Sequence, residues 1–301
     1  MNNIVRIKEP SYRYIRDTIN ALIGKYTFLE KIDIGNSYLR RKIFALKIGK
    51  SKEKVLYTAA FHGSEWITAL ILLKFTERIC ESLNTGEEFL SVNLKRALKD
   101  RSIIIVPCVN PDGVEIALKG AGSAKENKEL ILNLCENGVY NNWQSNARGV
   151  DINHNFNAGW EELHKMEKES GISSPCRSQY GGVEAHSEAE SRALVELCEL
   201  YKFRHVIALH SQGEEIYWQY GDKTPERSRL MAGVMSALSG YSIEEVKGLA
   251  SHGGFKDWFI ERFNKPGFTI EIGKGINPLP ISDFDSIYNR IEEMLLLASL
   301  M

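Results

Sequence analysis

The 301-residue sequence lacks paired cysteine motifs, long apolar runs and an excess of charge of either sign. Its five cysteines are scattered, with no C-x-x-C pair, so we expect free thiols in a reducing compartment. No apolar run is long enough for a transmembrane helix, and no apolar stretch follows a basic start as in a signal peptide. A net charge of -1 gives no electrostatic basis for binding nucleic acid. These absences predict a cytoplasmic protein that binds neither nucleic acid nor membrane.

The composition that is present is that of a globular enzyme. Apolar residues make up 43% of the chain and charged residues 26%. A chain of this length buries a core without disulfides or structural metals. Because no repeat or linker-like segment divides it, we expect one domain over residues 1–301, with residues 1–24 as a helical extension packed on it.

Strand-like and helix-like segments alternate along most of the chain. The apolar patterns predict strands at 28–35, 42–49, 54–62, 102–110, 205–210, 214–221 and 267–273. They predict helices at 65–83, 87–99, 187–201, 225–239, 254–263 and 282–300, and long loops over 120–182. This alternation predicts an α/β fold, a three-layer α/β/α sandwich around a mixed, mostly parallel twisted sheet.

Two histidines and a glutamate form a candidate metal site. His62 and Glu65 lie three residues apart directly after an apolar strand, and His210 ends another. The ends of strands in an open α/β sheet are where ligands are presented. Three protein ligands of this kind leave a fourth position for water, as in catalytic Zn²⁺ sites. Taken singly, each histidine could equally be a polar group satisfied by its surroundings.

Glu271 stands inside the apolar strand-like segment FTIEIG. An unpaired carboxylate in such a strand is costly to bury. Beside a zinc-activated water it would serve as a general base, and the alternative is a buried structural ion pair. We therefore predict one Zn²⁺ held by His62, Glu65 and His210, with Glu271 as the catalytic carboxylate.

In combination, the motifs HGSEW, NPDG, GVDINHNF, LHSQG, GGFKDW and FTIEIG resemble the zinc carboxypeptidase family. They follow the family's order from about residue 55 to 280. The segments NARGVDINHNFNAGW, HSQGEEIYW and PGFTIEIGKGINPLP resemble most closely the bacterial branch that cleaves γ-D-glutamyl–diamino acid bonds. The resemblance implies the zinc ligands and base given above, and it implies that Asp151 orients His62 through the second imidazole nitrogen.

The resemblance also implies substrate-binding roles around the metal, with departures from the family pattern. Gln144 aligns with the carbonyl-polarising arginine, and Arg148 is the nearby guanidinium, with a catalytic and substrate-binding role or a loop-ordering ion pair. Asn153 and His154 stand where many members carry an Asn-Arg pair that grips a C-terminal carboxylate, and His154 replaces the arginine. Leu249 stands where many members carry a mobile tyrosine, and His252 is a weak candidate for its proton-donating role.

These features predict a zinc peptidase acting on a peptide substrate. The expected bond lies between γ-D-Glu and meso-diaminopimelate or lysine in peptidoglycan-derived peptides, and a cytoplasmic setting implies muropeptide recycling. The alternatives are a metallocarboxypeptidase that trims ordinary C-terminal residues, an aspartoacylase-like zinc amidohydrolase, and a non-catalytic peptide-binding module.

Overall fold

One mixed sheet runs through the computed structural model, which describes residues 3–135, 137–245 and 247–301. Within these residues it has eight strands, in the order β1-β2-β4-β3-β5-β8-β6-β7. The pairs β4–β3, β3–β5, β5–β8 and β6–β7 are parallel and the others antiparallel. The strands are β1 (Glu30–Asn36), β2 (Lys42–Ile48), β3 (Lys54–Ala59), β4 (Ser102–Val106), β5 (His205–His210), β6 (Glu215–Tyr217), β7 (Ser242–Glu244) and β8 (Gly267–Glu271).

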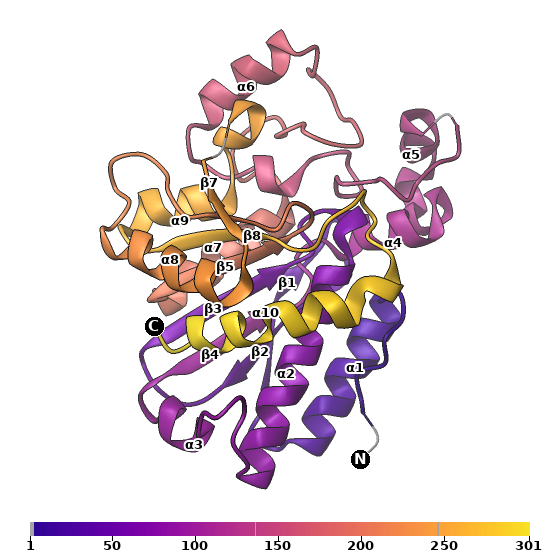
Figure 1. The fold of residues 1–301 in the computed structure, drawn as a ribbon. Helices are drawn as coiled ribbons and strands as arrows, with labels where there is room; N and C mark the ends of the chain where they lie inside the picture. The colour runs from indigo at the N-terminus through magenta and orange to yellow at the C-terminus, as the bar shows by residue number, and fades with distance from the viewer. Residues whose placement is uncertain (1–2, 136, 246) are drawn as a thin grey trace.

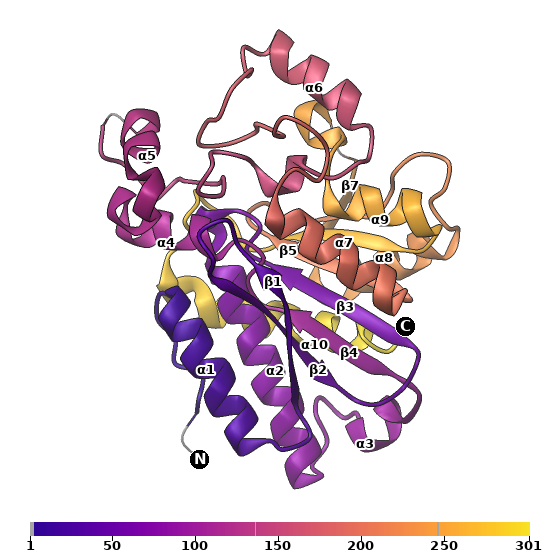
Figure 2. The ribbon, with the colours of Figure 1, turned by 180° about the vertical axis from the view of Figure 1, so that it is seen from behind.

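Helices cover both faces of the sheet and make it the middle of three layers (Figures 1 and 2). One face carries α1 (Tyr12–Lys25), α2 (Ile67–Thr85), α8 (Arg227–Ser239) and α10 (Phe284–Ala298). The other carries α7 (Ala189–Tyr201) and α9 (Phe255–Phe263). Alternate residues of a strand point to opposite faces, so Val55 joins the first apolar core and Leu56 the second. The predicted three-layer α/β fold is confirmed.

The N-terminal helix α1 packs against the first core and begins at Tyr12, not at the start of the chain. Ser11 caps α1 by accepting a hydrogen bond from the amide of Tyr14, and the helix starts at Tyr12. Its buried side chains Ile15, Ile19 and Leu22 belong to the first core. None of the helices in the described ranges combines the length and apolar character that a membrane span requires.

Three segments differ from the sequence prediction. Within 87–99 only α3 (Leu94–Ala97) is an α-helix, because Phe89 and Val92 pair in a small bridge first. Residues 120–182 are not only loops: they include α5 (Lys128–Leu134), which has seven residues, and α6 (Trp160–Glu169), which is mostly polar. The strand expected over 214–221 is limited to β6, and β7 was not predicted because all three of its residues are exposed.

The strand order brings distant parts of the chain to one end of the sheet. Strands β3, β5 and β8 are adjacent and parallel, so their carboxyl ends lie side by side. The segment from α4 (Pro111–Lys119) through α6 extends beyond the sheet at one end (Figures 1 and 2). Ligands of open α/β sheets bind beyond the carboxyl ends of such strands.

Candidate metal centre

Three side chains converge beyond the ends of β3 and β5. His62 follows β3, Glu65 ends a short 3-10 turn, and His210 is the last residue of β5. The Glu65 carboxylate lies between the imidazoles, with Oε1 2.6 Å from His62 Nδ1 and Oε2 3.1 Å from His210 Nδ1. One ligand atom of each residue lies within 4.8 Å of the others, so the group can hold a metal ion.

The turn that carries His62 and Glu65 is fixed by close backbone contacts. A Cβ at Gly63 would lie 2.3 Å from the carbonyl oxygen of Gly113, so only glycine fits there. Asn110 joins the two segments: its Oδ1 accepts from the Gly113 amide and its Nδ2 donates to the Phe61 carbonyl. The NPDG motif therefore holds the ligand turn from behind.

The charges at His62 fit a bound cation. Its Nε2 lies 3.1 Å from Asp151 Oδ1, so both ring nitrogens face carboxylates. Burial opposes a charged ring, but Glu65 and Asp151 outweigh it and raise the pKa of His62 well above its ordinary value. A metal ion at Nδ1 would replace that proton and leave a neutral ring that donates from Nε2 to Asp151. Two imidazoles and a carboxylate are a donor set that suits Zn²⁺.

Asp151 is held in place by backbone amides. Its Oδ1 accepts from the Asn153 amide and its Oδ2 from the Gln179 amide, each at 3.0 Å. The side chain is 2% exposed. Despite burial, His62 and these donors hold the pKa of Asp151 far below its usual range. It is an ionised, rigid acceptor beside His62, which is the geometry its predicted orienting role requires.

The turn after His210 is bonded both to the ligand carboxylate and to a distant loop. The Ser211 amide donates to Glu65 Oε2 at 3.2 Å. The Asn277 side chain clamps Ser211: its Oδ1 accepts from the Ser211 hydroxyl at 2.8 Å and its Nδ2 donates to the Ser211 carbonyl at 2.5 Å. The loop that follows β8 thus supports the ligand turn.

Replacing Asn277 by alanine is expected to weaken zinc binding about tenfold, because the Ser211 amide would no longer be held against Glu65. Competition with a fluorescent chelator measures the affinity. Ser282→Ala, at an exposed position between Asn277 and α10, is the control and should leave the zinc affinity unchanged. An Asn277→Ala protein with wild-type zinc affinity would show that the clamp does not act on the metal site.

Glu271 lies beside the metal group at the end of β8. It is opposite His210 in the parallel pair β5–β8 and opposite Glu215 in the antiparallel pair β6–β8. Burial and the Glu65 carboxylate raise the pKa of Glu271 well above its ordinary value. Glu215 accepts a hydrogen bond of 2.5 Å from the Tyr217 hydroxyl. Glu215 and Tyr217 were not predicted from the sequence as site residues, although EEIYW directly follows LHSQG.

Gln144 and Asn153 border the metal group on the loops of residues 140–155. The Gln144 carbonyl accepts from the Gly63 amide at 3.1 Å, which places this residue next to the His62 turn. Asn153 Oδ1 accepts from the Phe255 amide at 3.1 Å. Both residues are half-buried. The Oδ1 bond fixes the Asn153 amide and leaves its NH₂ group as a donor.

His154 is more enclosed than a direct substrate contact requires. The side chain is 9% exposed, and its Nδ1 lies 3.0 Å from the Gln179 carbonyl and 3.3 Å from Glu167 Oε1. Burial opposes its charge, but Asp151 and Glu167 raise its pKa. Glu167, from α6, is fully buried and was not found by sequence reasoning because α6 was not predicted. The contacts of His154 hold these loops together.

The contacts of Arg148 favour the loop-ordering alternative over direct substrate binding. Its Nη1 lies 3.5 Å from Glu188 Oε1, and its guanidinium lies over the Tyr38 ring at 5.4 Å. Glu188 Oε2 in turn accepts from Asn146 Nδ2 at 2.7 Å. This ion pair therefore connects the 146–150 turn to the start of α7.

Glu190, a buried acid near the start of α7, should make the stability of the protein depend on pH. Burial and the nearby Asp112 raise the pKa of the fully buried Glu190 to about 8. The folded state therefore keeps a proton that the unfolded state loses above about pH 4.5, and the free energy of unfolding falls between these values. Glu190→Gln should remove part of this fall, on the order of 1–3 kcal/mol between pH 5 and 9. Urea unfolding across pH measures it; parallel pH profiles for both proteins would contradict it.

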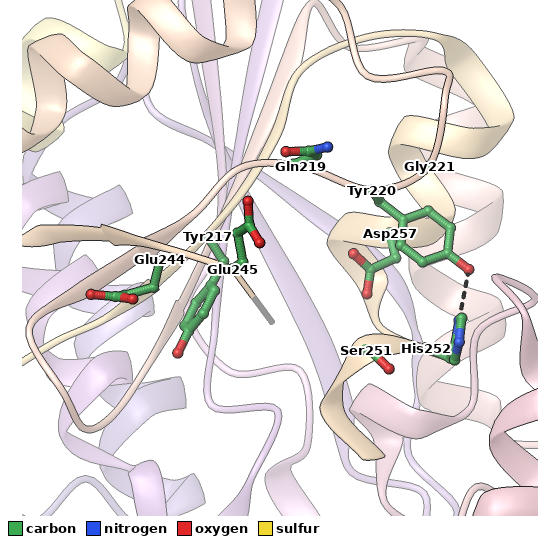
Figure 3. A pocket seen from close by; sticks show the side chains of 9 residues that line it. All are labelled: Tyr217, Gln219, Tyr220, Gly221, Glu244, Glu245, Ser251, His252 and Asp257. Carbon is green, nitrogen blue, oxygen red and sulfur yellow. Dashed lines mark hydrogen bonds between the residues drawn. The ribbon is translucent and has the colours of Figure 1, made fainter. Parts of the chain in front are cut away.

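His252 lies beside Gly159 and forms a hydrogen bond with Tyr220, which was not predicted from the sequence. Its Nδ1 is 3.1 Å from the Tyr220 hydroxyl (Figure 3). The backbone here is tightly packed, since a Cβ at Gly253 would lie 2.8 Å from the His154 carbonyl oxygen. Leu249, which takes the place of the family's mobile tyrosine, is half-exposed in the short turn before His252.

Comparison with known proteins agrees with this geometry. Residues 15–293 match the sequence profile described as zinc carboxypeptidase. The chain is 35% identical over 281 residues to γ-D-glutamyl-L-diamino acid endopeptidase 1 of Lysinibacillus sphaericus, covering 93% of this chain and 69% of that protein. It is 36% identical over 284 residues to YqgT of Bacillus subtilis, covering 93% and 74%. The structure of thrombin-activatable fibrinolysis inhibitor shares the fold, with a TM-score of 0.78, 21% identity and coverage of 99% and 76%.

Proposed function

Because the chain belongs to the zinc carboxypeptidase family and is therefore a zinc metallopeptidase, we propose that it hydrolyses peptides derived from peptidoglycan. The bond that we assign lies between γ-D-Glu and a diamino acid, either meso-diaminopimelate or lysine. Support for this substrate comes from the 35% identity to an endopeptidase named for that bond. The segments NARGVDINHNFNAGW, HSQGEEIYW and PGFTIEIGKGINPLP also resemble this branch.

The observation that carries the chemistry is the meeting of three strand ends. Strands β3, β5 and β8 bring His62, Glu65, His210 and Glu271 together from positions far apart in the sequence. We assign the first three as zinc ligands and Asp151 as the residue that fixes the His62 ring. When bound there, the ion supplies Lewis-acid polarisation of the substrate carbonyl and lowers the pKa of a water toward about 7.

Glu271 is the residue that moves protons in this proposal. Its raised pKa makes it a stronger base than an exposed glutamate, as general bases near neutral pH require. It takes a proton from the attacking water and passes it to the nitrogen of the leaving amine. No covalent intermediate on the protein is needed, because water attacks the amide carbon directly.

The bordering amides supply donors to the substrate. The side-chain amide of Gln144 takes the place of a carbonyl-polarising cation, next to the turn that carries His62. The NH₂ group of Asn153, fixed through the Phe255 amide, donates to a substrate carboxylate. His154 and Arg148 act behind these groups: His154 through Glu167, and Arg148 through Glu188, which orders the 146–150 turn.

A cytoplasmic location would give this reaction a defined purpose. Small peptides released from the wall contain γ-D-Glu–diamino acid bonds that ordinary peptidases for α-linked residues do not fit. We propose that the protein recycles such muropeptides inside the cell. Cell fractionation tests this location. We expect to recover the enzyme in the cytosolic fraction, and recovery in the medium would contradict the proposal.

The competing function is removal of ordinary C-terminal residues. His154 counts against it, because it replaces the arginine that grips a C-terminal carboxylate in many family members. The zinc-loaded protein should release the diamino acid from L-Ala-γ-D-Glu-meso-diaminopimelate and leave α-linked peptides with C-terminal Phe, Leu or Arg almost intact. Chromatography of both reactions measures the difference. Efficient trimming of α-linked peptides without cleavage of the γ-linked one would reject this substrate and leave the peptidase assignment standing.

A further inference from the structure

A cavity of about 300 Å³ is lined in part by β6 and β7, next to strand β8, which carries Glu271. Its lining includes Tyr217, whose hydroxyl donates to Glu215, and Glu215 lies opposite Glu271 in the sheet. On its far side the cavity is lined by His252, which precedes the glycine packed against the His154 carbonyl. The cavity is therefore linked to Glu271 through Tyr217 and Glu215, and to the loop that carries Asn153 through the backbone contact that follows His252.

Close packing and a side-chain hydrogen bond fix the walls of the cavity. Figure 3 shows Glu244, Glu245 and Tyr217 on one side and Tyr220, Asp257 and His252 on the other. Gly159 allows the second side to close: its φ is +61°, and a Cβ there would lie 2.6 Å from His252 Nδ1. The Tyr220–His252 hydrogen bond spans this wall.

The charge of the cavity is negative. Asp257 is buried and is neutralised by the adjacent Lys256, whose Nζ also donates to the Gln219 carbonyl. Within residues 3–135, 137–245 and 247–301, neither Glu244 nor Glu245 has an ion-pair partner. By contrast, Glu214 nearby is paired with both Lys274 and Arg290. Two carboxylates without an ion-pair partner among the described residues thus line a cavity that also carries two tyrosine rings.

Carboxylates and tyrosine rings together are the groups that bind an ammonium ion. The carboxylates attract it by charge, and the negative faces of the rings add a cation–π contribution. A peptide substrate that binds at the metal centre would bring its side chains to this cavity. In the proposed substrate, the diamino acid keeps one free amine after its other amine has formed the scissile bond.

We propose that this cavity binds the side-chain ammonium of the diamino acid, with Glu244 and Glu245 as the specificity-determining residues. The inference rests on the proposed function, because it assigns one part of that substrate to a place in the structure. The assignment is the same for lysine and for meso-diaminopimelate, since both carry the distal amine.

Two matched pairs of substrates test the inference, each pair differing in the distal amine alone. They are L-Ala-γ-D-Glu-X with X as lysine or norleucine, and with X as meso-diaminopimelate or 2-aminopimelate. In whichever pair is cleaved, kcat/KM should be about tenfold or more higher for the amine-bearing member. Raising the salt concentration should shrink this ratio. Equal rates within a cleaved pair would overturn the inference alone, and cleavage of neither pair would overturn the proposed function together with it.

A second experiment removes the two carboxylates from the cavity. The double variant Glu244→Gln, Glu245→Gln should lose most of the preference for the amine, chiefly through a higher KM for the amine-bearing substrate. Glu88→Gln, at an exposed position outside the cavity after α2, is the matched control and should keep the wild-type ratio. A double variant with a wild-type melting temperature and an unchanged ratio would overturn the assignment of these two residues.

Discussion

Replacing Glu271 by glutamine is expected to lower kcat at least a thousandfold while leaving zinc bound. The substitution keeps the size of the side chain and removes the carboxylate that we propose as the acceptor of the proton from water. Glu271 is not within the metal group, so the ligands His62, Glu65 and His210 stay as they are. Metal analysis together with initial rates on the γ-linked tripeptide measures both effects.

The matched control for this variant is Glu215→Gln. Glu215 is opposite Glu271 and accepts from Tyr217, but it is not assigned to the reaction. We expect a change in kcat of less than about tenfold, since only its charge near Glu271 is lost. A Glu271→Gln protein that keeps more than a tenth of wild-type kcat would show that another group is the base.

Replacing His210 by alanine is expected to abolish both zinc binding and turnover. His210 lies buried at the end of β5, and its Nδ1 faces the Glu65 carboxylate that also faces His62. Without it, two ligands remain, which is one fewer than catalytic zinc sites use. Zinc at a thousandfold excess over its Kd should stabilise the wild type by about 4 kcal/mol and the variant not at all. Thermal unfolding with and without zinc measures this.

His164→Gln is the control for the loss of a histidine. His164 is stacked on Trp160 in α6 and is not part of the metal group. On addition of zinc, the melting temperature of this variant should rise by the same amount as that of the wild type. A His210→Ala protein that still binds one zinc per chain with wild-type affinity would place the metal elsewhere.

The parts of the fold and site that could be predicted are those with strong local patterns. The apolar run SIIIV became β4, and HVIALH became β5 with both of its ends as predicted. His62, Glu65, His210 and Glu271 could be placed together because strand ends in a parallel arrangement meet at one edge. The family resemblance, which the comparisons confirm, added Asp151, whose carboxylate faces His62 Nε2.

The parts that could not be predicted depend on contacts between distant residues. Helix α6 is largely polar, yet its Glu167 is fully buried because His154 and the Gly181 amide meet it there. Arg148 has the chemistry of a substrate clamp, but Glu188, forty residues later, takes its guanidinium. Asn277 supports Ser211 across 66 residues, and no local pattern signals such a clamp. Side-chain pairing of this kind appears only once the chain is folded.

The reaction that we propose for this protein is hydrolysis of a γ-D-Glu–diamino acid bond by direct attack of water. Its most direct test is mass spectrometry of L-Ala-γ-D-Glu-meso-diaminopimelate incubated with the zinc-loaded protein in water enriched in oxygen-18. We expect L-Ala-D-Glu with one heavy oxygen in its γ-carboxylate and unlabelled diaminopimelate. An intact tripeptide, or release of free alanine with the γ-bond uncut, would contradict the claim.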